Sequence, residues 1–257
     1  MRYLRLTYRL PLLLLHVIAG VLAAIALLNP LTRRLFRSAP EGWLIPWWSR
    51  WMLRVFGIHV RVAGEPLAGA ALHVANHLSW VDIVVLHSVK LMAFVAKDEI
   101  RRWPLVGWMA SRAGTIYHRR GSPHSLRMVS DTMTRRLETG FAVALFPEGR
   151  AGAGETVLTF HGRLFQCALS AGVPVQPVAL RYLEDDGSVN TLTPFRRGES
   201  FLVNLFRVLS RRRTIAELRF CAPLESKDTG GRRVLARESR QRIVSVLAQA
   251  GRNRTSN

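Results

Sequence analysis

A histidine and an aspartate that are five residues apart offer the clearest chemistry in this sequence. His77 and Asp82 lie between two apolar runs, residues 70–75 and 83–86, with the composition of a buried strand and of a following helix. If Ser79 caps that helix, Asp82 falls in its first turn and His77 in the loop before it. An imidazole oriented by a carboxylate can take a proton from a weak nucleophile such as a hydroxyl. The spacing therefore indicates a general base.

Two other interpretations of the same stretch stay open. Ser79 followed three residues later by Asp82 also fits a capping box, in which the acid only satisfies amide groups at a helix end. His73 and His77 are four residues apart, a spacing that metal ligands also use, but no third ligand or supporting group is evident nearby. We therefore predict no metal site, and the choice between catalysis and capping needs more of the sequence.

The composition limits the partners that this protein can have. The chain has 257 residues, 49% of them hydrophobic, and a formal net charge of +20 that comes mostly from arginine. The length suits one large domain, or a domain with an appended anchor. A strongly basic chain favours polyanionic surfaces, either anionic bilayer headgroups or nucleic acid. Because the arginines are scattered through apolar sequence and no recognised nucleic-acid-binding module is present, we expect anionic membrane lipids as partners and no nucleic acid.

The N-terminal segment has the features of a membrane anchor. Residues 10–28 are almost wholly apolar and just long enough to span a bilayer. Arginines flank this run on both sides: Arg2, Arg5 and Arg9 precede it, and Arg33, Arg34 and Arg37 follow it. These flanks favour an anchor over a cleaved signal peptide, because they hold both ends at anionic headgroups. Whether the anchor spans the bilayer or enters it from one face is left open.

Residues 43–56 continue the membrane theme, because they place four tryptophans beside arginines. Tryptophan suits the headgroup layer, where its ring is half apolar and its N–H stays wet, although the same residues would also suit a soluble core. We predict an anchor and interfacial segment at residues 1–57 and a catalytic domain at residues 58–257.

Strand-like and helix-like segments alternate from residue 58 onward, which predicts an α/β layered sheet. The predicted strands cover residues 58–62, 70–75, 92–96, 115–118, 141–146, 175–180 and 217–222. The predicted helices cover residues 83–89, 102–112, 126–139, 163–171 and 232–250. One irregular insertion, residues 184–213, contains an apolar run at 201–209 that is suited to face a membrane. Functional groups of such sheets gather at the strand ends.

Two groups of polar residues follow predicted strands. Arg119 and Arg120 come after residues 115–118, where their guanidinium groups could hold a phosphate; a solvated basic turn is the alternative. Glu148, Gly149 and Arg150 come after residues 141–146, where an acid, a permissive glycine and a base could line a polar ligand; a plain turn would use the same glycine.

Pro174 and Pro177 surround the start of the strand predicted at residues 175–180. Proline has no N–H to donate to a strand ladder. The pair therefore predicts an edge strand or the wall of a pocket.

Four of these pieces, taken in order, resemble the motifs of the glycerolipid acyltransferase family, specifically the bacterial lysophosphatidic acid acyltransferases. The matching segments are Asn76-His77 through Asp82, Gly114 through Arg120, Phe146-Pro147-Glu148-Gly149, and Val173 through Val178. The resemblance covers roughly residues 60–182. Each motif is weak by itself, but four in the same order favour catalysis over capping.

The resemblance implies a mixed α/β sheet flanked by helices, with an N-terminal membrane-docking segment. It also implies that His77 is the general base and that Asp82 orients and stabilises the imidazolium. The hydroxyl would attack an acyl-CoA or acyl carrier protein thioester directly, without a covalent acyl-enzyme, which agrees with the absence of a Gly-x-Ser-x-Gly nucleophile elbow. No cofactor or metal is expected. The implied location is the cytoplasmic side of a bacterial inner membrane.

The resemblance implies lysophosphatidic acid as the acceptor and phosphatidic acid as the product, with Arg119, Arg120, Glu148, Gly149 and Arg150 binding the substrate. Members with phosphate-bearing acceptors commonly read Glu-Gly-Thr-Arg in the third motif, whereas here Arg150 and Ala151 follow the glycine. Arg120 keeps the second-motif arginine and favours a phosphate. Acylation of another lysolipid, such as lyso-ornithine lipid, therefore stays an alternative, as does a non-catalytic lipid-binding protein of the same fold.

Overall fold

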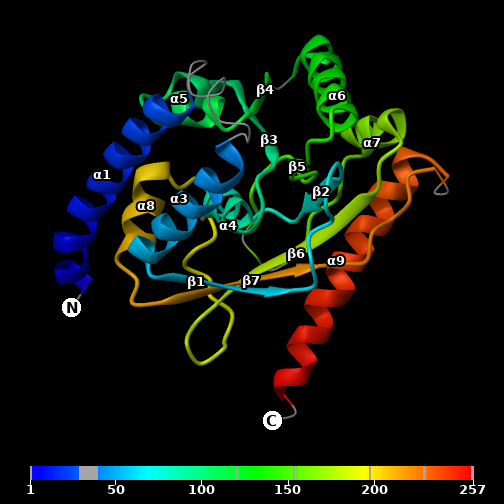
Figure 1. Cartoon of the computed structure of the whole chain (residues 1–257). Coiled ribbons are helices and arrows are strands. Elements are labelled where there is room, and N and C mark those ends of the chain that lie inside the picture. The colour runs from blue at the N-terminus through cyan, green and yellow to red at the C-terminus, as the bar shows by residue number, and fades with distance from the viewer. Residues whose placement is uncertain are drawn as a thin grey trace.

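The computed structural model describes residues 2–28, 40–119, 121–152, 154, 156–196, 198–227 and 230–255. In this part of the chain, seven strands form one sheet in the order β1-β7-β6-β2-β5-β3-β4 (Figure 1). The strands are β1 (Ile58–Ala63), β2 (Leu72–Ala75), β3 (Ala93–Lys97), β4 (Ile116–His118), β5 (Val143–Leu145), β6 (Val175–Leu183) and β7 (Thr214–Phe220). Only β6 and β7 pair antiparallel, and the other neighbours are parallel. The predicted mixed α/β sheet is confirmed, and all seven predicted strands are present.

Helices cover both faces of the sheet (Figure 1). The described helices are α1 (Arg2–Leu27), α3 (Glu41–Phe56), α4 (Val81–Val89), α5 (Val106–Arg112), α6 (Pro123–Glu138), α7 (Gln166–Ala171), α8 (Phe201–Leu209) and α9 (Arg232–Thr255), with short 3₁₀ helices η1 (Asp98–Arg102) and η2 (Gly162–Phe165). Apolar residues of α3, α4 and α8 share one buried cluster, and those of α6, α7 and α9 share another. Alternate residues of β2 contribute to the two clusters, because successive side chains of a strand point to opposite faces.

The helix α1 packs against the rest of the protein along one side. Arg9 is buried and donates hydrogen bonds to the carbonyl oxygens of Phe56, Leu209, Arg211 and Arg212, at 3.2, 2.9, 2.5 and 3.3 Å. The carbonyls of Phe56 and Leu209 lie at the ends of α3 and α8, where backbone acceptors lack partners within the helix, and those of Arg211 and Arg212 lie in the segment that follows α8. The arginine that was predicted to flank a membrane segment is therefore a buried contact between three helices.

The approach of α1 to α3 is close where α1 has a glycine. A Cβ atom at Gly20 would lie 2.3 Å from Nε1 of Trp48, so no larger residue fits there without rearrangement. Trp48 stacks on His16 with ring centroids 4.9 Å apart and donates to the carbonyl of His16 at 3.2 Å. Trp48 thus belongs to packed structure, whereas Trp43, Trp47 and Trp51 are exposed. Packing in a protein core therefore describes Trp48, whereas a place in the headgroup layer remains open for the three exposed tryptophans.

The other side of α1 is apolar and exposed. Residues 3–27 form the one helix in the described ranges that is long and apolar enough to cross a membrane. The predicted second basic flank, Arg33, Arg34 and Arg37, lies outside the described residues. The division of the chain at residue 57 coincides with the turn between α3 and β1 and stays a prediction.

The edge strand predicted from Pro174 and Pro177 is wrong, because β6 lies in the middle of the sheet between β7 and β2. The regular ladder between β6 and β7 begins at the pair of Val178 and Phe220, just after Pro177. The missing N–H of Pro177 therefore falls where β7 has already ended. A proline excludes regular pairing at its own position but does not exclude the strand from the interior of a sheet.

The helix predicted at residues 102–112 is also shorter than expected. Residues 98–102 form η1, and α5 begins only at Val106. Pro104 lies between the two, and Leu105 has a φ of 59°, the only positive φ outside glycine in the described residues. The chain therefore turns sharply between η1 and α5.

Candidate active site

His77 and Asp82 meet at the end of β2, as the sequence predicts. His77 lies in the loop after β2, and Asp82 lies in the first turn of α4. The Nδ1 atom of His77 is 2.8 Å from Oδ2 of Asp82. The aspartate is fully buried, whereas 20% of the histidine side chain is accessible. A buried carboxylate therefore holds an imidazole that a substrate can still reach.

The carboxylate of Asp82 also caps the start of α4. Its Oδ2 atom accepts from the backbone N–H groups of Leu78 and Ser79 at 2.6 and 2.9 Å. Its Oδ1 atom accepts from the hydroxyl of Tyr182 at 2.7 Å. The capping and catalytic interpretations are thus compatible, since one carboxylate makes both sets of contacts. The capping bonds fix the carboxylate that orients His77.

Tyr182 stays protonated in this arrangement. Burial raises the pKa of its hydroxyl well above the ordinary value, and the neighbouring charge of Asp82 raises it further. The hydroxyl is therefore a permanent hydrogen-bond donor to the carboxylate.

The ring of His77 is held from one face and from its backbone. Phe146 stacks on the ring with centroids 4.1 Å apart and an interplanar angle of 15°. The backbone N–H of His77 donates to Oε1 of Glu148 at 3.2 Å, and its carbonyl accepts from the N–H of Gly152 at 2.8 Å. Because Asp82 occupies Nδ1, Nε2 is the ring nitrogen left to take a proton from a substrate. Phe146 and Glu148 of the third predicted motif therefore position His77 of the first.

Glu148 lies against the catalytic loop with one oxygen uncommitted. The residue is buried, and its Oε2 atom has no hydrogen-bond partner among the described residues. Burial raises the pKa of Glu148 to about 7, although the N–H and charge of His77 act in the opposite direction. Near neutral pH this buried carboxyl can therefore carry a proton.

The remaining predicted substrate-binding residues follow different strands, and those strands lie at different distances from the catalytic pair. Gly149 has a φ of +69°, which explains a glycine at this turn, and Arg150 beside it is exposed. Arg119 is exposed at the end of β4, an edge strand that β5 and β3 separate from β2. Arg120 lies outside the described residues. The structure thus brings Glu148 to the catalytic pair and leaves Arg119 on the outermost strand.

Two residues near the site received no role from the sequence. The side chain of Asn76 donates to the carbonyl of Leu180 and accepts from its N–H, both at 2.9 Å, so it copies a backbone pairing between β2 and β6. Asn76 directly precedes His77 in the first motif, and this position could have indicated a structural role for it. Tyr182 lies in an apolar strand far along the chain, and no local pattern indicates its contact with Asp82.

His73 does not join His77 in a metal site. It is buried and packs edge-on against Phe220 with centroids 6.2 Å apart. Burial, together with the charge of Lys90, lowers the pKa of His73 to about 3, so its ring is neutral. No cluster of three or more histidine, cysteine, aspartate or glutamate side chains suited to a metal occurs in the described ranges.

Comparisons with known proteins agree with this geometry. The Acyltransferase family profile matches residues 59–181, which include His77, Asp82 and Glu148. The lyso-ornithine lipid O-acyltransferase of Pseudomonas aeruginosa is 38% identical over 219 residues, which cover 85% of this chain and 80% of that protein. The 1-acyl-sn-glycerol-3-phosphate acyltransferase of Neisseria gonorrhoeae is 32% identical over 174 residues, which cover 68% of each chain.

A solved structure shares the fold over nearly the whole chain. The 1-acyl-sn-glycerophosphate acyltransferase of Thermotoga maritima superposes with a TM-score of 0.67 over 97% of both chains, at 20% sequence identity. Together with the matched relatives, the sheet and the paired His77 and Asp82, this similarity identifies the chain as a member of the glycerolipid acyltransferase family, alongside enzymes that acylate lysolipids.

Proposed function

We propose that this protein transfers a fatty acyl group from an acyl-CoA or acyl carrier protein thioester to the hydroxyl of a lysolipid, with lyso-ornithine lipid as the acceptor. The observation that carries the reaction is the contact between a partly accessible His77 and a buried Asp82. The pair provides a base for a hydroxyl and no nucleophile for a covalent intermediate. The choice of lyso-ornithine lipid as the acceptor has separate support, from the relatives and from the residues that follow Gly149 in the third motif.

The reaction follows from the two nitrogens of His77. Nε2 takes the proton of the acceptor hydroxyl while the oxygen forms a bond to the thioester carbonyl carbon. Nδ1–H stays bonded to Asp82, whose negative charge stabilises the imidazolium. The tetrahedral adduct then loses the thiolate as its C–S bond breaks, and the proton passes from Nε2 to sulfur. The products are an ester and a free thiol.

The acceptor assignment is supported by the relatives and by Arg150. The relatives named as lyso-ornithine lipid O-acyltransferases include the Pseudomonas aeruginosa protein, and another from Rhodobacter capsulatus that is 32% identical over 203 residues. An ornithine headgroup carries an amine and a carboxylate in place of a phosphate. The third motif lacks the Thr-Arg pair common with phosphate acceptors and has Arg150 and Ala151 instead.

Lysophosphatidic acid, the acceptor predicted from the motifs, is the second candidate. Its support is the arginine pair Arg119 and Arg120, kept at the end of the second motif, and the similarity to the Neisseria gonorrhoeae enzyme. The two acceptors differ in charge and shape at the headgroup, so one preparation can discriminate between them.

Acyl transfer by the purified full chain in detergent tests both the proposed reaction and the proposed acceptor. Acyl-CoA and acyl carrier protein thioesters are each offered with lyso-ornithine lipid and with lysophosphatidic acid, and thiol release and ester formation are followed. We expect faster transfer to lyso-ornithine lipid, and loss of transfer in His77→Ala. A preference for lysophosphatidic acid would overturn the acceptor assignment alone. Undiminished transfer by His77→Ala would overturn the mechanism.

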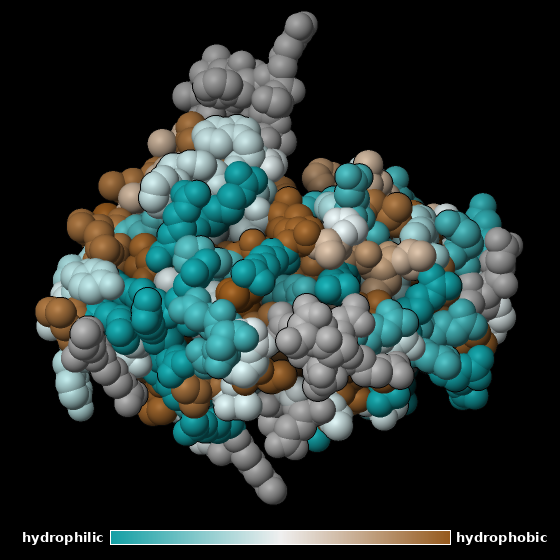
Figure 2. All heavy atoms as spheres, turned by 90° about the horizontal axis from the view of Figure 1, so that it is seen from below, coloured by the Kyte–Doolittle hydropathy of each residue, from teal (hydrophilic) through white to brown (hydrophobic). Residues whose placement is uncertain are grey.

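We also infer that the protein acts at a bacterial inner membrane from the cytoplasmic side. Its support is the apolar surface of three neighbouring helices, which exposes Leu12, Leu15, Ile18 and Leu22 of α1, Trp43, Trp47 and Trp51 of α3, and Leu202, Val203 and Phe206 of α8. Figure 2 shows apolar residues on the side of the molecule that α1 occupies. Both substrates of the proposed reaction carry acyl chains, and a lipid surface would supply the acceptor directly to the site.

A further inference from the structure

We propose that Asn204, in the insertion that follows β6, is a positioning residue for the catalytic pair and acts through Trp80. The inference rests on acyl transfer by His77 and Asp82 as proposed above. Asn204 touches neither of them. It holds the indole of the residue at the N-terminus of α4, the helix that carries Asp82.

The contact between the two residues is direct and buried. The Nε1–H group of Trp80 donates to Oδ1 of Asn204 at 2.9 Å, across 124 positions of sequence. Asn204 has no exposed surface. A buried asparagine in an otherwise amphipathic helix requires partners for both ends of its amide, since unsatisfied polar groups are costly in the interior.

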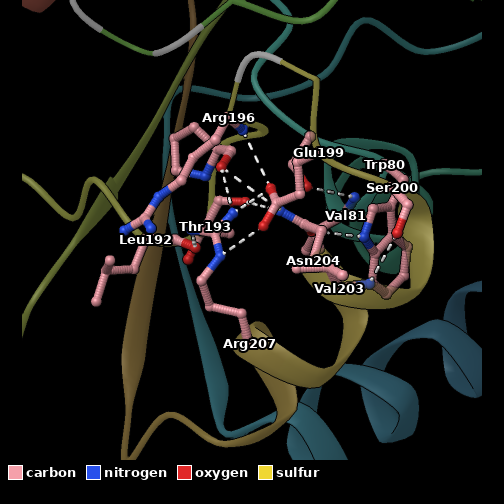
Figure 3. Close-up of polar contacts among 12 residues, drawn as sticks. Trp80, Val81, Leu192, Thr193, Arg196, Glu199, Ser200, Val203, Asn204 and Arg207 are labelled. Atoms are coloured by element: carbon pink, nitrogen blue, oxygen red, sulfur yellow. Dashed lines mark hydrogen bonds and ion pairs between the residues drawn. The ribbon is translucent and has the colours of Figure 1, made fainter.

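The orientation of the Asn204 amide follows from its other neighbours. Its Nδ2 atom lies 3.4 Å from the carbonyl oxygen of Thr193, 3.5 Å from that of Pro194 and 3.1 Å from Oε2 of Glu199. All three atoms are acceptors, so the amide nitrogen must face them and the amide oxygen must face Trp80. Figure 3 shows Asn204 between the indole on one side and Glu199 on the other.

Glu199 is itself fixed by an arginine on the same helix as Asn204. Arg207 donates to both carboxylate oxygens of Glu199, with Nε at 3.0 Å from Oε1, and it also donates to the carbonyl oxygens of Leu192 and Pro194. Burial raises the pKa of Glu199, but the hydrogen bonds from Arg207, Asn204 and the Arg196 N–H, together with the charge of Arg207, lower it overall. The negative charge of Glu199 keeps the Asn204 amide nitrogen turned away from Trp80.

Aromatic contacts restrain the indole from two further directions. The Trp80 ring packs edge-on against Phe56 of α3 and Phe201 of α8, each with centroids 5.4 Å apart. With the hydrogen bond to Asn204, the ring is fixed in position and in rotation. The insertion also reaches the catalytic loop through its backbone, because the N–H of Phe195 donates to the carbonyl of Leu78 at 3.0 Å.

The position of Trp80 matters because it is the residue between the histidine loop and α4. The carbonyl of Trp80 accepts from the N–H of Ile83 in the first turn of α4. A shift of this turn moves Asp82 relative to His77, and misplacement of a catalytic group by about 1 Å can cost roughly 100-fold in rate. Without the Asn204 oxygen, the indole N–H loses its partner, and only the aromatic contact with Phe201 still restrains the turn toward α8.

A double-mutant cycle between Asn204→Leu and Trp80→Phe tests the inference. Trp80→Phe removes the N–H but keeps an aromatic ring, and Asn204→Leu keeps the side-chain size but removes the acceptor. We expect each single change to lower kcat by roughly 10- to 100-fold with KM nearly unchanged, since no substrate contact is lost. The double variant should be no slower than the slower single variant. Additive losses, or single variants within twofold of the parent, would overturn the proposal.

Asn190→Ala provides a matched control in the same insertion. Asn190 is equally buried, donates to Glu184 and accepts from the N–H groups of Leu192 and Thr193, but it does not contact Trp80. All rates are normalised to the folded fraction. The control should keep the kcat of the parent per folded molecule. An equal fall in kcat for Asn190→Ala would show a general effect of the insertion and overturn the specific role of Asn204.

A spectroscopic readout separates this inference from the proposed reaction. The proton that His77 Nδ1 shares with Asp82 is observed by NMR in protein labelled with ¹⁵N-histidine, whether or not turnover occurs. We expect its resonance to move in Asn204→Leu and Trp80→Phe and not in Asn190→Ala. An unmoved resonance in both variants overturns the positioning role. Absence of acyl transfer in the parent together with a moved resonance overturns the proposed function alone.

Discussion

Tyr182 donates a hydrogen bond to Oδ1 of Asp82 at 2.7 Å, while Oδ2 of the same carboxylate contacts His77. The tyrosine belongs to β6 and the other two residues to the end of β2 and the start of α4. The general base is therefore supported by a neighbouring strand as well as by its own loop.

Replacing Tyr182 with phenylalanine removes this donor from a buried carboxylate. We expect a loss of about 1–3 kcal/mol in the free energy of unfolding, since a buried acceptor is left unpaired. We also expect kcat to fall by roughly 10-fold, less than for a change at His77 itself. Denaturant unfolding and acyl transfer measure the two effects. Tyr117→Phe is the control, because that hydroxyl contacts Ser111 and Gly107 instead.

His77→Ala and Asp82→Asn should differ in stability although both lose activity. Removal of the base should lower kcat by about 10²- to 10⁴-fold and leave the fold intact, because the histidine ring is partly exposed. Asp82→Asn should also destabilise the protein by about 1–3 kcal/mol, because an amide cannot accept all the bonds that the carboxylate accepts. Thermal unfolding and activity assays, carried out on both variants, measure this difference. Equal stability of the two variants would contradict the capping role of Asp82.

The pH dependence of stability should report on Glu148. Because burial raises its pKa from 4.5 to about 7, the folded state binds a proton that the unfolded state releases between these values. Glu148 therefore lowers stability as pH rises through this window. His73, whose pKa is lowered to about 3, acts in the opposite direction below its ordinary pKa of 6.5. Only a comparison of variants isolates Glu148.

In Glu148→Gln the contribution of the carboxyl is absent. Between pH 5 and pH 8, we expect the free energy of unfolding of this variant to fall less, or to rise more, than that of the parent. The reason is that only the parent has the Glu148 carboxyl, which ionises between about pH 4.5 and about pH 7. Chemical denaturation at a series of pH values gives the two curves. Parallel curves would show that Glu148 titrates alike in both states.

Arg9→Met should destabilise the whole domain and not only α1. Arg9 makes four hydrogen bonds to carbonyl oxygens, and a hydrogen bond to a charged group contributes about 1.5–3 kcal/mol. We expect a loss of about 3 kcal/mol or more, measured by thermal unfolding in detergent. Arg5→Met is the matched control, since among the described residues Arg5 donates only to the carbonyl of Ser210, and its side chain is less buried. Equal losses would mean that the bonds of Arg9 are not the cause.

The sequence indicated the strands and the catalytic pair because both depend on neighbouring residues. His77 and Asp82 are joined by a short loop and one helical turn, so their meeting follows from local geometry. The seven strands follow from apolar runs. Tyr182, which contacts Asp82, lies 100 residues away from it, and Asn204 lies 124 residues away from its partner Trp80, so no spacing rule connects them to the loop.

Charge and proline patterns were less reliable for a similar reason. Arg9 has the appearance of a headgroup contact, yet it is buried, because the ends of α3 and α8 happen to meet at α1. Pro177 suggests an edge strand, yet it lies in a central one, because the neighbouring strand ends first. In both cases the outcome depends on segments that the local pattern does not contain.

The attachment of α1 limits how this protein can be shortened for study. Enzymes with an apolar N-terminal helix are often trimmed to obtain a form that needs no detergent. Here such a deletion would uncover the ends of α3 and α8 and remove the side chain that holds them together. Because α8 also carries the asparagine that contacts Trp80, the damage would extend to the catalytic loop. Exchanging outward-facing leucines of α1 for polar residues is the safer route to solubility.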